Sequence, residues 1–313
     1  MTDAVLEGTL RRRLRTLLGC MYGSREDEAY AAVSSSIGRH ADQAAKPDGV
    51  PGRSAFSEAD ALLISYGDMI APPLGDGPEA RESALARLGS FLDAYAPGLF
   101  SYLHILPFYP YSSDDGFSVK DYRAVNPSLG SWDDVAALGG RRKLAFDLVL
   151  NHASAQGQWF RAFLARQAPY DRYFITRPVG YDASTVTRPR THPLITPYEL
   201  RDGTTAGVWT TFSADQVDLD FSEPAVLAEF IDILLFYAEK GARLIRLDAI
   251  AYLWKKDGTS CVHLPQTHAA VKAMRLALEI LGLDVKLLTE TNVPHAENMS
   301  YFGDGDEAHM VYN

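Results

Sequence analysis

The sequence predicts an α/β fold, a (β/α)8 TIM barrel with one inserted domain and about six of its eight strands within these 313 residues. Apolar strand-like runs alternate with amphipathic helical stretches, which is typical of right-handed βαβ units around a parallel sheet. Polar residues follow several of these runs, as expected where the carboxyl ends of barrel strands carry the chemistry. The sequence has no glycine-rich dinucleotide or phosphate loop, and this disfavours an open nucleotide-binding sheet.

The expected elements follow this alternation along the chain. The opening stretch has leucines at helical spacing with arginines between them, which predicts an amphipathic helix, and a second helix is expected at 26–37. The expected barrel strands cover residues 62–66, 102–107, 143–150, 243–247 and 285–289, with a sixth beginning at 309–312. The expected barrel helices cover residues 79–95, 131–138, 225–240 and 268–281, and a Pro/Gly loop covers residues 72–78.

One long interval breaks the alternation. Residues 153 to about 222 separate the third expected strand from the next long helix, and such a length is unusual for a plain loop. We therefore expect a small inserted domain over the mouth of the barrel. The predicted organisation is an N-terminal helical segment, a first barrel part, the inserted domain and a second barrel part ending near strand six, at residues 1–60, 61–166, 167–222 and 223–313.

Composition and charge exclude several classes of function. The net charge of −10 argues against a nucleic-acid or anionic-membrane surface, because both attract a basic face. No apolar run approaches the about 20 residues of a membrane helix, and the first residues lack the order of a secretory signal. Cys20 and Cys261 form neither a disulfide framework nor a metal-ligand pattern. We expect a cytoplasmic protein without a metal site.

The first candidate site residues are Arg246 and Asp248, two positions apart in an apolar strand-like run. That spacing places both side chains on one face of a strand. A buried strand tolerates such charges only when they are paired or used. A structural ion pair and a functional pair explain this stretch equally well. Runs of the same kind that end at Asn151 and at Glu290 shift the balance towards function.

Four motifs resemble, in order and spacing, the signature regions of the α-amylase superfamily, glycoside hydrolase family 13. They are Asp147-Leu-Val-Leu-Asn151-His152, Gln216-Val-Asp218-Leu-Asp220, Arg246-Leu-Asp248-Ala249 and Thr289-Glu290-Thr291. The long insertion after the third strand is similar to that family's domain B. The resemblance runs from about residue 60 to the end and implies the barrel fold.

The resemblance implies a reaction that retains the anomeric configuration through a covalent glucosyl–enzyme. Such a reaction needs an ionised carboxylate nucleophile and a protonated carboxyl about 5–5.5 Å away. By resemblance, Asp248 is the nucleophile and Glu290 the acid/base. Arg246 would favour the ionised form of Asp248, and burial beside the preceding leucines would raise the pKa of Glu290. An exposed strand-end glutamate is the competing interpretation of Glu290.

Further positions match residues that hold the sugar in relatives. The implied substrate-binding residues are Asp114, Phe117, His152, Gln216, Arg246 and Tyr252. Aromatic faces suit the C–H surfaces of sugars, although a buried Phe or Tyr is more often plain core. Asp147 is expected to be structural and to bond Arg246.

Residues 109–119 and 249–268 are similar to the sucrose-phosphorylase group, and within it to the branch acting on glucosylglycerate or sucrose 6-phosphate. Such enzymes let phosphate attack the glucosyl enzyme and release α-glucose 1-phosphate. The expected partners are therefore a small glucoside and inorganic phosphate as co-substrate, with no organic cofactor. Lys255 and Lys256 could attract phosphate, but we expect a solvated lysine pair.

The resemblance also implies a third carboxylate, from a motif after the seventh strand. The chain stops at Asn313, inside the sixth expected strand. We expect a fragment of a longer protein; a second chain that completes the barrel, as in a homodimer, and a different fold are the alternatives. For function, a hydrolase or transglucosylase on the same scaffold and an inactive sugar-binding fragment remain alternatives to the phosphorylase.

Overall fold

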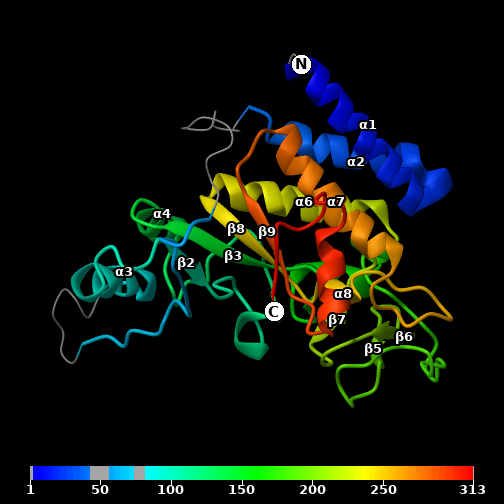
Figure 1. The fold of residues 1–313 in the computed structure, drawn as a ribbon. Coiled ribbons are helices and arrows are strands. Elements are labelled where there is room, and N and C mark those ends of the chain that lie inside the picture. The colour runs from blue at the N-terminus through cyan, green and yellow to red at the C-terminus, as the bar shows by residue number, and fades with distance from the viewer. Residues whose placement is uncertain (1–2, 43–55, 74–81, 313) are drawn as a thin grey trace.

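The computed structural model describes residues 3–42, 56–73 and 82–312. Six parallel strands form one sheet in the order β1-β2-β3-β8-β9-β10. Their bounds are Leu62–Ser65, Tyr102–Ile105, Lys143–Val149, Ala242–Asp248, Lys286–Thr289 and Met310–Val311. The sheet curls as part of a (β/α)8 barrel, so the predicted fold class is confirmed (Figure 1).

Helices cover the outer face of this sheet and lie close to their expected positions. The barrel helices are α3 (Ala84–Tyr95), α4 (Trp132–Gly139), α6 (Pro224–Glu239) and α7 (Pro265–Ile280). Ser83 caps α3 by accepting a hydrogen bond from the Ala86 amide. The helix therefore begins at Ala84, later than the expected start at residue 79. The expected start of that helix, and most of the expected loop at 72–78, lie outside the described residues.

Two N-terminal helices, α1 (Asp3–Tyr22) and α2 (Glu26–Arg39), form a further layer outside the barrel helices (Figure 1). Helix α1 packs on α7 and α2 packs on α6. Polar contacts fix this layer: Ser36 Oγ donates to the Ala228 carbonyl at 2.8 Å, and Arg39 Nη2 lies 2.7 Å from Asp232 Oδ1. The helices share the main hydrophobic core, because Leu14 and Leu18 of α1 are fully buried in it.

The interval after β3 contains several short elements. Strands β4 (His152–Ser154) and β7 (Gln216–Asp218) pair antiparallel, and so do β5 (Ile195–Glu199) and β6 (Thr205–Trp209). The β5–β6 hairpin lies apart from α3 and α4 (Figure 1) and has its own small core around Trp209. An inserted unit is therefore present, while its exact bounds at 167 and 222 stay a prediction.

Two short helices were not expected from the sequence, α5 (Gln158–Leu164) and α8 (His295–Met299). Each spans at most two turns, too short for apolar periodicity to stand out. Among the described residues, no helix is long and apolar enough to cross a membrane.

Candidate active site

The centre of the site is a row of charged side chains across the inner face of the sheet. Register pairs Asp147 of β3 with Arg246 of β8, and Val149 with Asp248. Arg246 Nη1 donates to Asp147 and, at 2.9 Å, to Asp248 Oδ1. On the other side, His104 Nε2 of β2 lies 2.8 Å from Asp147 Oδ2. All four side chains are largely buried, which fits the expected Asp147–Arg246 bond.

Burial and neighbouring charges give the two aspartates different acidities. Burial alone would raise the pKa of Asp147, but His104 and Arg246 hold that pKa below its ordinary value. For Asp248, burial dominates: it raises the pKa to about 7 against the lowering effect of Arg246, and the Glu290 charge adds to the rise. Arg246 thus favours the ionised form of Asp248, as expected, without fully offsetting the burial.

Glu290 follows β9 directly and is held beside Asp248 by the backbone. Its amide donates to the Leu247 carbonyl at 3.1 Å. Its carboxylate accepts a hydrogen bond from the Ala249 amide at 2.9 Å and another from Asn292 Nδ2. The backbone therefore fixes Glu290 against the end of β8. Glu290 is only partly buried, although burial beside the preceding leucines was expected.

A second group of predicted residues surrounds the buried imidazole of His152. Its Nε2 donates to the Phe117 carbonyl at 3.0 Å, and its Nδ1 lies 3.3 Å from Asn151 Nδ2. Gln216 Nε2 donates to Asp114 Oδ2 at 2.8 Å. Burial lowers the pKa of His152, which keeps the ring neutral near pH 7. Both ring nitrogens of His152 therefore have protein partners, and these contacts fix the ring and the Gln216 amide in place beside Asp114.

The turn that carries Asp114 has an unusual backbone. Asp114 and Asp115 adopt φ values of 56° and 47°, in the left-handed region. Gly116 follows with φ 108°, and a Cβ there would lie 2.7 Å from the Pro107 carbonyl oxygen. Only glycine fits at this position. Strained turns of this kind cluster at ligand-binding sites.

Aromatic side chains join this group to the loop after β8. The ring of Phe212 lies 5.2 Å from the ring of His152 and 5.5 Å from that of Tyr252. Burial and the Glu290 charge raise the pKa of Tyr252, and the Arg190 charge opposes that rise. Phe117 lies under the guanidinium of Arg246, at 5.6 Å from the ring centroid. The structure therefore brings all eight predicted site residues into one region.

Lys255 was expected to be half of a solvated lysine pair, and this is wrong. Its side chain is only 2% exposed, and its ammonium group lies 2.6 Å from Asp218 Oδ2 and 2.6 Å from Asn151 Oδ1. Asp218 also accepts hydrogen bonds from the amide and hydroxyl of Thr211. The adjacent lysines point differently because Lys256 is exposed. Lys255 therefore ties the loop after β8 to β7 and to the end of β3.

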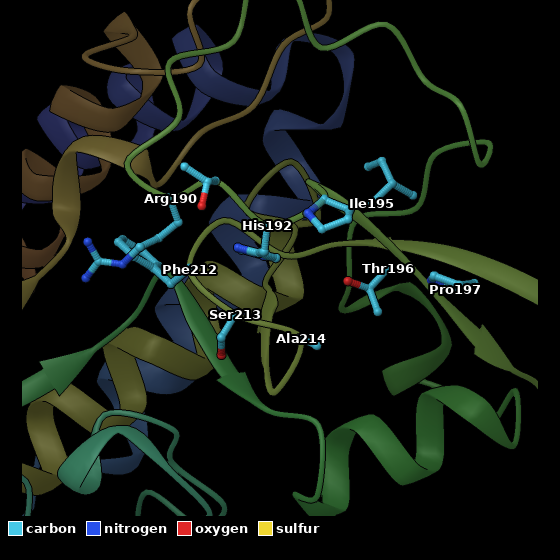
Figure 2. A pocket seen from close by; sticks show the side chains of 10 residues that line it. Arg190, His192, Ile195, Thr196, Pro197, Phe212, Ser213 and Ala214 are labelled. Carbon is cyan, nitrogen blue, oxygen red and sulfur yellow. The ribbon is translucent and has the colours of Figure 1, made fainter.

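Beside Phe212 lies a cavity of about 440 Å³. In the view of Figure 2, Arg190 and Phe212 lie on one side of it, and Ile195, Thr196 and Pro197 on the other. His192 also lines the cavity, and its Nε2 lies 2.8 Å from the Thr210 carbonyl oxygen. Within the described part of the chain, Arg190 has no carboxylate partner. The cavity therefore has one positive charge without an ion-pair partner among the described residues, and Phe212 in its wall contacts His152 and Tyr252 of the site.

Five residues of the site were missed from the sequence: His104, Asn151, Arg190, Phe212 and Lys255. Asn151 lies inside the motif at residues 147–152, so its position in the sequence could have identified it as a site residue. The other four lie outside the motifs or at positions that patterning assigns to core or surface. Across residues 3–42, 56–73 and 82–312, no group of three or more His, Cys, Asp and Glu side chains is arranged to hold a metal ion.

Comparison with known proteins identifies the class. The family described as Alpha amylase, catalytic domain, matches residues 100–313. The chain belongs to the α-amylase family. Among curated proteins, a glucosylglycerate phosphorylase of Spirochaeta thermophila is 49% identical over 303 residues, which are 96% of this chain and 50% of that protein. A glucosylglycerate phosphorylase of Escherichia coli K12 is 44% identical over 82% of this chain and 45% of its own length.

A solved structure gives the same picture. The crystal structure of sucrose 6F-phosphate phosphorylase from Thermoanaerobacter thermosaccharolyticum matches with a TM-score of 0.71 and 25% identity. The match covers 83% of this chain and 53% of that one. The chain spans about half the length of the curated relatives it matches.

Proposed function

We propose that this chain belongs to a retaining glycoside phosphorylase that transfers α-glucosyl from a small glucoside to phosphate. The observation that carries the proposal is Asp248 bonded to Arg246 with Glu290 held at the next strand end. The similar glucosylglycerate phosphorylases make glucosylglycerate the first substrate to test, and sucrose-like glucosides the second.

The proposed chemistry has two steps. Asp248 attacks the anomeric carbon while the bond to the leaving oxygen breaks and Glu290 gives that oxygen its proton. Phosphate oxygen then attacks the same carbon and displaces Asp248, while Glu290 takes back the proton of the attacking hydrogen phosphate. The pKa of Asp248 at about 7 predicts that the free protein reacts faster above pH 7 than below it. No cofactor is required by these steps.

The remaining predicted residues are proposed to hold the sugar. Asp114, His152 and Gln216 offer a carboxylate, a neutral ring and an amide within one hydrogen-bonded group. Phe117 and Tyr252 supply aromatic faces. Arg246 acts on the sugar through Asp248, because its guanidinium is committed to two aspartates.

The cavity beside Phe212 is the proposed place of the leaving group and of phosphate. Arg190 is a free cation in an acidic protein, and a guanidinium binds carboxylate or phosphate through two parallel hydrogen bonds. An anionic leaving group such as glycerate would therefore bind Arg190 first, and the attacking phosphate would bind the same guanidinium after the leaving group has departed.

The test is release of α-glucose 1-phosphate from glucosylglycerate and from sucrose, each with and without phosphate. We expect phosphate-dependent release, abolished in Asp248→Asn, with Arg201→Gln as an exposed control in the β5–β6 turn. Product formation that does not need phosphate would replace the proposal by a hydrolase or transglucosylase. Glucoside binding without turnover would replace it by a sugar-binding protein.

The small-molecule partners in this proposal are the glucoside and phosphate. Among the described residues, β1 and β10 each have one neighbouring strand, and Leu62 and Ile64 on β1 are exposed. We propose that further strands, from a longer chain or a second copy, cover these edges. Light scattering would distinguish the two, because only the second predicts a dimer of this chain. A phosphorylated product fits the cytoplasmic location that we expect.

A further inference from the structure

A second cavity, of about 590 Å³, lies at the end of the barrel opposite Asp248. It is bounded by the residues that begin β3 and β8 and by the carboxyl ends of α4 and α6. Asp248 is the last residue of β8, whereas Arg243 in the cavity wall is the second. The cavity is therefore separated from the candidate active site by the length of the sheet.

The wall of this cavity is strongly basic. Its charged residues are Arg141, Arg142, Lys143, Lys240 and Arg243, with Glu239 as the one acid among them. Arg141 and Arg142 share the carboxylate of Asp93. Glu239 faces His40. Because the chain as a whole carries ten more acidic than basic residues, this local excess of positive charge is not a consequence of composition.

Three of these cations form no ion pair with a carboxylate in the described parts of the chain, although the Lys143 charge helps to lower the pKa of Asp60. Lys143 and Lys240 lie over aromatic rings instead, at 4.9 Å from the Tyr102 centroid and 5.4 Å from the Trp132 centroid. Arg243 makes one contact, to the neighbouring Ala242 carbonyl at 3.3 Å. It stands where the β3–β8 register shifts, and such an irregularity re-aims the side chain of the extra residue.

Arg142 is buried in the cavity wall, and its Nη1 is closed to a ligand in the cavity. Its side chain is only 5% exposed, yet no described residue accepts a hydrogen bond from its buried Nη1. A buried donor without an acceptor is costly, and native structures contain few of them. Basic residues do stabilise the carboxyl ends of helices such as α4 and α6. That effect does not account for Lys143 and Arg243, which lie at the beginnings of β3 and β8.

We propose that this cavity binds a small organic phosphate. Guanidinium groups match the geometry of phosphate oxygens, and Arg243 offers one, with the ammonium groups of Lys143 and Lys240 in the same cavity wall. The volume exceeds the need of a bare phosphate ion and lies in the range of pockets for small organic ligands. The site is separate from the proposed active site, so the two proposals stand or fall independently.

The experiment uses Trp132 as a local reporter, because Lys240 lies over its ring. The indole signals of the 15N-labelled chain are followed by NMR while α-glucose 1-phosphate or inorganic phosphate is added. We expect a saturable shift of the Trp132 signal with either phosphate, larger affinity for the sugar phosphate, and no shift with glucose. Signals of Trp209, in the inserted unit, report binding near the candidate active site separately.

Two variants decide the assignment, with one matched control. Arg243→Gln and Lys143→Gln should each weaken binding at the Trp132 site by about tenfold or more, as loss of a charge-assisted bond predicts. Arg201→Gln, an exposed arginine in the β5–β6 turn, should leave it unchanged. The proposal is overturned if the wild-type Trp132 signal does not move, if glucose moves it equally, or if both cavity variants bind like the wild type.

Discussion

Arg246 Nη1 lies 2.9 Å from Asp248 Oδ1, and the same nitrogen also contacts Asp147. One cation thus serves two buried carboxylates. Asp147 has a second partner in His104, whereas among the described residues the Asp248 carboxylate has no side-chain partner besides Arg246. Burial is therefore offset at Asp147 and only partly offset at Asp248, which explains their opposite pKa shifts.

The raised pKa of Asp248 predicts that its charge weakens the fold. The pKa is about 7 in the folded chain against an ordinary 3.8, so the folded state binds more protons between these values. The free energy of unfolding should fall as pH rises from about 4 to about 7, by up to about 1.4 kcal/mol per pH unit. Asp248→Asn removes the ionisable carboxyl and with it this loss of stability. In thermal unfolding, the stability of the variant relative to the wild type should increase as pH rises from about 4 to about 7. A stability difference that does not change with pH would contradict the raised pKa of Asp248.

His104 is predicted to hold Asp147 in place. His104→Leu leaves Asp147 Oδ2 buried without its partner, and this should cost about 1–3 kcal/mol of unfolding free energy. His104→Gln keeps an N–H donor at the same position and should cost less. Chemical denaturation at pH 7.5 measures both. Equal losses in the two variants would show that packing, not the hydrogen bond, is the contribution of His104.

Lys255 and Asp218 are predicted to be strongly coupled. Lys255→Met leaves the Asp218 charge buried without its cation and should destabilise the chain by about 3–5 kcal/mol. Adding Asp218→Asn should recover much of that loss, since the buried charge is then gone. A double-mutant cycle on unfolding free energies gives the coupling. Additive losses would contradict the buried ion pair.

His309 is predicted to make stability fall in acid. Burial, together with the nearby Arg275 and Lys286 charges, lowers its pKa to about 4 from an ordinary 6.5. Its Nδ1 accepts a hydrogen bond from the Leu287 amide at 3.0 Å, a role that only the neutral ring can play. The unfolded chain therefore binds the proton first, and stability should drop as pH falls from 6.5 towards 4.

His309→Gln keeps an acceptor for the Leu287 amide and has no ring to protonate. Its melting temperature should therefore fall less than that of the wild type over the same acid range. Parallel curves for the two proteins would contradict the lowered pKa of His309.

Much of the barrel could be predicted because its signals are local. The apolar runs at 143–150 and 243–247 are followed by polar or charged residues, so the same stretch predicted both a strand and a candidate site. The side-chain contacts between strands could not be predicted: nothing in the sequence shows that His104 of β2 bonds Asp147 of β3. Periodicity places residues on a face, but only the curl of the sheet decides which faces meet.

Lys255 is a residue whose environment the local sequence predicted wrongly. Two adjacent lysines in a polar loop normally face water, and the sequence offers no sign that one reaches Asp218 across the site. Arg190 and Phe212 belong to an irregular inserted unit whose shape depends on its small core around Trp209. Contacts of this kind depend on tertiary packing, so local propensity could not reveal them.

The ion pair between Lys255 and Asp218, with Asn151 beside it, connects three segments that are far apart along the chain. Closing loops of that size is slow, and each contact must await the folding of the strands that carry it. The group proposed to bind the sugar should therefore assemble after the core strands during refolding and come apart before them on heating. Ligand binding would then be lost at a lower temperature than helical circular dichroism, and the gap between the two transitions would measure how loosely the site is attached to its scaffold.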